Sequence, residues 1–94
     1  MSAKSITDMS VEIDAEFDRI VAQGSDDELF ASGYLRGHFD LIVARLTMAG
    51  EEDQMKFWPA LYGSVEEHAN ELDSNDRELV DSMITRLKNK AEAA

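Results

Sequence analysis

The sequence predicts an all-α fold: an antiparallel four-helix bundle with the second helix central. Apolar residues recur with helical spacing in four segments, and no segment alternates long enough to form a strand. Short connections join the segments, which makes neighbouring helices antiparallel. The 94 residues are enough for one modest core. We therefore expect a single domain over residues 1–94, with fraying at residues 1–5 and 91–94.

An apolar stripe that ends at a glycine predicts the first helix. The acidic residues of this segment lie outside the stripe, as expected for an amphipathic helix. Gly24 follows directly and can stop the helix at its carboxyl end. The stripe consists of Ile6, Met9, Ile13, Phe17, Ile20 and Val21.

A capping box marks the start of the second helix. Ser25 and Glu28 have the Ser-x-x-Glu spacing in which each side chain satisfies a backbone N–H group. Gly50 is expected to end this helix after about Ala49. The helix has two apolar stripes, so we expect it to contact neighbours on both sides. One stripe is Phe30, Gly33, Tyr34, Gly37, Leu41, Ala44 and Met48, and the other is Leu35, Phe39, Ile42 and Leu46.

Gly33 and Gly37 form a notch on this helix together with Ala44. Each glycine costs about 1 kcal/mol relative to alanine in a helix interior, and close packing of a neighbouring helix would offset that cost. We expect such a helix to fill the notch with its aromatic residues. The alternative is a notch left open for a ligand or partner.

Polar residues separate the two stripes. Arg36 and Asp40 have the i,i+4 spacing of an ion pair. Tyr34, His38 and Arg45 are expected to form a polar island, which either satisfies groups at the core edge or binds a partner.

Pro59 complicates the third helix. An internal proline costs about 3 kcal/mol, and the residue before it, Trp58, is disfavoured in helical geometry. We expect Pro59 to open the main helix after a short turn; a kinked helix is the alternative. Phe57 and Trp58 are not expected on one helical face. We expect burial against a loop, and the alternative is an exposed Trp58 that acts as a docking residue. The predicted stripe is Met55, Trp58, Leu61, Tyr62, Val65, Ala69 and Leu72.

The fourth helix is predicted to begin at a Ser74 cap. Arg86, Lys88 and Lys90 suit its negative carboxyl end. Its apolar face consists of Leu79, Val80, Met83, Ile84, Leu87 and Ala91.

The net charge of −11 disfavours two classes of partner. Both a phosphate backbone and an anionic membrane would be repelled, so we expect neither nucleic acid nor membrane as partner. The sequence has no cysteine and no apolar run of the kind that a signal peptide or membrane span needs. We expect a cytoplasmic protein that binds another protein, with a basic partner suited to its charge, or that self-associates.

Catalytic chemistry has little support in the sequence. The only histidines are His38 and His68, and no nucleophile-elbow pattern is present. His68 and Glu71 have the reverse of the Glu-x-x-His order of di-iron bundles. "GYLRG" is similar to a phosphotransfer acceptor motif, yet Gly33 stands where the acceptor histidine would be. We predict no catalytic residue, metal or cofactor.

The run "SDDELFASGYLRGH", residues 25–38, resembles the YfcL family of small uncharacterised bacterial proteins. The resemblance continues more loosely through the apolar pattern of the later helices, including the Ser74 cap, Leu79 and Val80, and leaves out roughly the first ten residues. It implies a cytoplasmic helical protein and carries no known activity or catalytic residue.

The function that we predict is a non-enzymatic protein-interaction module that binds through the second helix and the region around Trp58. A small-molecule or cation-binding bundle and a His38-dependent phosphotransfer or enzymatic role are the alternatives. The candidate binding residues are Gly33, Tyr34, Arg36, Gly37, His38, Arg45 and Trp58.

Overall fold

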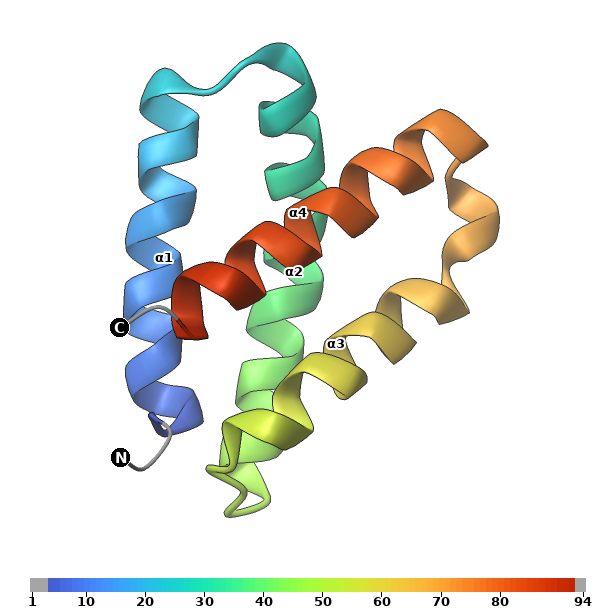
Figure 1. Cartoon of the computed structure of the whole chain (residues 1–94). Coiled ribbons are helices and arrows are strands. Elements are labelled where there is room, and N and C mark those ends of the chain that lie inside the picture. The colour runs from blue at the N-terminus through green and yellow to red at the C-terminus, as the bar shows by residue number, and fades with distance from the viewer. Residues whose placement is uncertain (1–3, 93–94) are drawn as a thin grey trace.

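A computed structural model describes residues 4–92 as four α-helices, which confirms the predicted fold class (Figure 1). α1 and α2 form one antiparallel hairpin, and α3 and α4 form a second that crosses the first obliquely. α2 packs against each of the other three helices and is central, as predicted. The elements are α1 (Ile6–Gln23), α2 (Asp26–Met48), α3 (Gln54–Glu67), the short 3-10 helix η1 (Ala69–Glu71) and α4 (Ser74–Glu92).

One core lies where the four helices meet. Edge-to-face ring contacts run through it from Phe17 to Phe39, at 5.5 Å between centroids, and from Phe39 to Phe57, at 4.9 Å. They join α1, α2 and α3, and aromatic pairs of this geometry stabilise a core beyond their buried area. None of the helices in residues 4–92 is long and apolar enough to cross a bilayer.

Polar side chains cap the start of each helix. Ser5 accepts from the Asp8 N–H at 3.0 Å and starts α1. The predicted capping box of α2 is confirmed, because Ser25 and Glu28 each accept from the other's backbone N–H. The cap of α4 is Asp73, whose carboxylate accepts from the Asp76 N–H at 2.8 Å. The prediction of Ser74 as this cap is therefore wrong by one residue.

The two chain ends differ from the expected fraying where the structure describes them. Ser5 caps α1, and Ala91 is buried within α4, which continues to Glu92. The remainder of that prediction falls on residues 1–3 and 93–94, outside the described residues.

α3 begins five residues before Pro59, contrary to the expectation that the proline opens it. The Asp53 carboxylate accepts from the Met55 N–H at 2.9 Å and starts the helix early. Pro59 then removes only the bond to the Met55 carbonyl, near the amino end of the helix. Phe57 and Trp58 are both buried, as expected, and the alternative of an exposed Trp58 is wrong.

Three residues of the stripes predicted for the first and third helices lie at the surface instead. Met55 is 78% exposed, Tyr62 is exposed and Val21 is 64% exposed. Glu16 and Phe57 are buried in α1 and α3 although neither was placed on a stripe. α3 buries Phe57 against Phe39 of α2, while Trp58 faces residues of α4. Because α3 has neighbours on two sides, its buried face differs from the predicted stripe.

Candidate functional site

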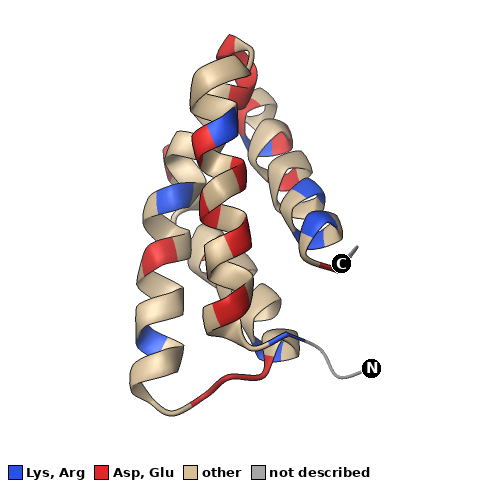
Figure 2. Ribbon diagram, turned by 90° about the vertical axis from the view of Figure 1, so that its left-hand side faces the viewer, with Lys and Arg blue, Asp and Glu red and all other residues tan. Residues whose placement is uncertain are grey.

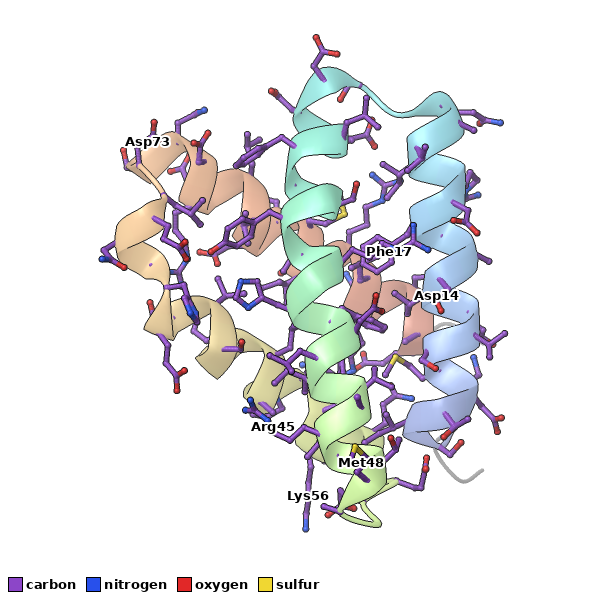
Figure 3. All side chains as sticks on the ribbon, turned by 180° about the vertical axis from the view of Figure 1, so that it is seen from behind. Asp14, Phe17, Arg45, Met48, Lys56 and Asp73 are labelled. Atoms are coloured by element: carbon purple, nitrogen blue, oxygen red, sulfur yellow. The ribbon has the colours of Figure 1, made fainter. Side chains whose placement is uncertain are left out.

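The first predicted stripe of α2 is uncovered along most of its length. In Figure 3, α2 lies in front of the other helices and no ribbon covers the side turned to the viewer. Leu41 is 50% exposed and Met48 is 87% exposed on this side. We call this surface the α2 outer face; it consists of Phe30, Gly33, Gly37, Leu41, Ala44 and Met48, all of which are exposed.

The glycine notch at the middle of the α2 outer face is open. A Cβ atom built on Gly33 or on Gly37 would meet nothing within 4 Å beyond the helix itself. The prediction that a neighbouring helix fills the notch is therefore wrong. α1, α3 and α4 pack instead on the second stripe, around Leu35, Phe39 and Ile42, which are buried.

Two of the predicted polar residues lie together beside the α2 outer face, and one of them, His38, meets side chains from α3 and its carboxyl end. The Tyr34 and His38 rings lie 5.0 Å apart, and the His38 and His68 rings 5.3 Å apart. His38 Nδ1 lies 2.8 Å from Ser64 Oγ. The predicted island thus contains Tyr34 and His38, and it gains Ser64 and His68 from α3 and its carboxyl end.

Burial changes the proton affinities in this cluster. Desolvation raises the pKa of Tyr34 above its usual value, with Glu71 adding to the effect. The Tyr34 hydroxyl is buried and has no hydrogen-bond partner among the described residues. Desolvation lowers the pKa of His38, and the charge of His68 lowers it further. Both effects favour the neutral ring of His38, and the Glu71 carboxylate opposes them.

The Ser64–His38 contact has the distance of a nucleophile and base, but its surroundings do not suit acyl transfer. Ser64 lies inside α3, where the neighbouring backbone N–H groups bind carbonyls of the preceding turn. Those groups are not available to stabilise an oxyanion. Residues 4–92 also contain no group of three or more His, Asp and Glu side chains placed to hold a metal ion.

Arg36 lies on the other edge of the α2 outer face, toward α1. Its guanidinium bonds Asp18 at 3.2 Å and lies 5.4 Å from the centre of the Phe17 ring. The predicted ion pair of Arg36 with Asp40 is not formed, because Arg36 contacts a carboxylate and an aromatic ring of α1 instead. Desolvation raises the pKa of Asp14 at the same edge. The charges of Asp40 and Asp18 raise it further, and the charge of Arg36 lowers it.

Arg45 and Trp58 lie away from the Tyr34–His38 cluster. Arg45 is exposed, and in Figure 3 it projects from the α3 side of α2. It borders a cavity of 290 Å³ with Ser64 and Glu67, at the lower limit for small-ligand pockets. Trp58 is 6% exposed and donates its indole N–H to Gln54. It borders a 240 Å³ cavity between α3 and α4, so it does not contribute to the α2 outer face.

A buried carboxylate at the α1–α4 seam was not among the predicted site residues. Glu16 is 4% exposed and pairs with Arg19 and with Arg86, the latter at 3.1 Å, while Lys90 lies 4.0 Å away. Arg86 also pairs with Glu28, so this cluster links α1, α2 and α4. The sequence feature that could have indicated the burial of Glu16 is its position one residue before Phe17, next to the buried stripe.

Comparison with known proteins gives the family. A family model described as "YfcL protein" matches residues 7–89. The chain is also 38% identical over 84 residues to "Uncharacterized protein YfcL" of Escherichia coli (strain K12), covering 87% of this chain and 91% of that relative. No solved structure matches. The chain belongs to the YfcL family.

Proposed function

We propose that this chain is a non-enzymatic, cytoplasmic protein-interaction module that binds another protein through the α2 outer face. The observation that carries the proposal is the uncovered apolar face with an open notch. Phe30, Leu41 and Met48 expose large apolar side chains along one line, and Gly33 and Gly37 lie between them with free space above.

Two physical arguments support this assignment. An exposed, contiguous apolar strip is typical of an interaction surface, whereas single exposed apolar residues are common on any protein. Two glycines in a helix interior also cost stability, about 1 kcal/mol each. Within residues 4–92 no contact offsets that cost, because no atom of these residues beyond the helix itself would lie within 4 Å of a Cβ at Gly33 or Gly37. Close approach of a partner would offset it.

Affinity capture with matched variants tests the proposal. The immobilised chain is incubated with bacterial lysate, and retained proteins are identified by mass spectrometry. We expect the double variant Leu41→Ser, Met48→Ser to lose the proteins that the wild type retains. Met55→Ser is the control, because Met55 is a second highly exposed methionine that lies on α3 beside Trp58.

Circular dichroism and thermal unfolding must show that all variants are folded. Retention of the same proteins by the double variant would contradict the proposal. Loss of them in Met55→Ser alone would place the binding surface beside Trp58 instead.

A further inference from the structure

We infer that the partner of the α2 outer face is a basic amphipathic helix, whose apolar side chains seat on the Gly33–Gly37 notch and whose cations pair with Asp14, Asp18 and Asp40. This inference rests on the proposed function and names the chemistry of its partner. It follows from the shape of the face, from the charges at its α1 edge and from the charge of the whole chain.

The shape of the face suits a helix that runs along α2. Gly33, Gly37 and Ala44 follow one another at four-residue and seven-residue steps, so they lie on one line of the helix surface. Small residues on such a line allow two helix axes to approach to about 8 Å, the lower end of the usual range. Phe30 and Met48 stand beyond the two ends of this line and would contact the partner's apolar side chains.

The α1 edge of the face has more negative than positive charge. Asp14, Asp18 and Asp40 surround a single cation, Arg36, which bonds Asp18. Within residues 4–92 no ion pair involves Asp14 or Asp40. Figure 2 shows acidic residues at successive turns of α1, the helix nearest the viewer, beside α2. Lys or Arg side chains from a partner would relieve the repulsion among these carboxylates.

A second copy of the chain fits the face less well. Two copies of α2 related by a two-fold axis and packed antiparallel would place their α1 edges side by side. The carboxylates of Asp14, Asp18 and Asp40 would then face the same carboxylates of the partner. Each copy also has a net charge of −11, which opposes association at low salt. A basic partner has neither penalty.

Two synthetic helical peptides test the inference. Both have one stripe of Leu and Ala; the flanking positions are Lys in one peptide and Gln in the other. Fluorescence anisotropy at low salt should show the Lys peptide binding the full chain about tenfold more tightly, as expected for two or three exposed ion pairs. This advantage should shrink as added salt screens the charges.

Matched variants separate local pairing from attraction by the net charge. Asp14→Asn with Asp40→Asn should abolish the tenfold preference. Asp76→Asn with Glu78→Gln removes the same amount of charge from α4, and this variant should keep most of the preference for the Lys peptide. Leu41→Ser should weaken both peptides.

The remaining outcomes distinguish the inference from the function on which it rests. Equal binding of both peptides by the wild type, lost in Leu41→Ser, would overturn the basic partner and keep an interaction surface. Binding of neither peptide, with a concentration-dependent mass in sedimentation that Leu41→Ser abolishes, would make the occupant a second copy. Binding of neither peptide by a monomeric chain would overturn the inference, and failure of the lysate capture as well would overturn both.

Discussion

Glycine has opposite roles at two places in this chain. Gly24 ends α1 with φ −76°, a value that any residue adopts, so its backbone conformation does not require glycine. The available space does require glycine, because a Cβ atom there would lie 2.6 Å from the Ile20 carbonyl oxygen and 2.9 Å from Ile20 Cγ2. Gly33 and Gly37 face open space in a helix interior. Close approach within the chain explains the first glycine, and no contact in the part of the chain that the structure describes explains the other two.

Alanine substitutions should therefore change stability in opposite directions. Gly24→Ala should lower the free energy of unfolding by about 1–3 kcal/mol, because the clash involves backbone that cannot move aside. Gly33→Ala should raise it by about 0.5–1 kcal/mol through helix propensity. Urea unfolding of both variants measures this. A destabilised Gly33→Ala would mean that the notch is occupied within the chain after all.

Glu16 is the residue on which the α1–α4 seam depends. Its carboxylate is buried and accepts from Arg19 and Arg86. Glu16→Gln should lower the free energy of unfolding by about 1–3 kcal/mol, since hydrogen bonds to a charged group are lost. Glu12→Gln is the control: Glu12 pairs with Lys4 near the surface, and an exposed pair contributes at most about 1 kcal/mol. Equal effects in urea unfolding would contradict a special role for Glu16.

At the scale of the element, the cap of α2 can be followed by its own titration. The Ser25 backbone N–H, then Arg86 and the Ser25 side chain, lower the pKa of Glu28 to about 2. Ser25→Ala should cost about 1 kcal/mol of stability through the lost cap. NMR titration of the Glu28 carboxyl should give a midpoint near 2 in the wild type and a higher one in Ser25→Ala. An unchanged midpoint would show that the backbone N–H of residue 25 and Arg86 set it without the Ser25 hydroxyl.

The sign of the Glu28 contribution follows from the direction of its shift. The pKa is lower in the folded chain than the usual 4.5, so the unfolded chain binds the proton more readily. The stabilisation is present above pH 4.5 and is lost as the pH falls toward 2. Acid should therefore weaken the start of α2 in this window.

The helices were predictable because their signals are local. Ser25 and Glu28 are three residues apart, and Gly50, with φ +80°, follows the end of α2 directly. Which stripe of α2 is buried was not predictable in this way. Both stripes are apolar, and the choice depends on where the α3–α4 hairpin crosses, which is a property of the tertiary packing.

The candidate site was predicted in its residues and only partly in its arrangement. Tyr34 and His38 are one turn apart, so their contact follows from helix geometry. Ser64 lies on α3 and His68 at its carboxyl end, so the spacing of residues within α2 could not predict their presence in the cluster. Arg36 pairs with Asp18 and not with Asp40, because α1 places the Asp18 carboxylate and the Phe17 ring within reach of the same guanidinium. Such competition between partners is decided by tertiary contacts.

At the scale of the whole molecule, the bundle buries three sides of α2 and leaves the fourth open. α4 crosses behind α2 in the view of Figure 3, with α1 on one side and α3 on the other. The α2–α3 seam packs a histidine, His38, between side chains of the two helices.

Acidification should loosen this seam. The groups that face His38 are Tyr34 on α2, Ser64 and His68 on α3 and at its end, and Glu71 on η1, with Arg77 of α4 near Tyr34. Burial and the His68 charge outweigh the opposing Glu71 carboxylate and lower the pKa of His38. Protonation therefore costs more in the folded chain than in the unfolded one.

The stability of the wild type should consequently fall as the pH drops from 7 through 6.5, the usual histidine value, and level off below the folded pKa of His38. His38→Gln should flatten this part of the profile, measured by urea unfolding between pH 7.5 and about 5, above the range in which carboxylates titrate. His68→Gln should reduce the slope without removing it, because desolvation is the larger cause. A wild-type profile that is flat over this range, or one that His38→Gln leaves unchanged, would mean that water reaches His38 and that the seam already opens at neutral pH.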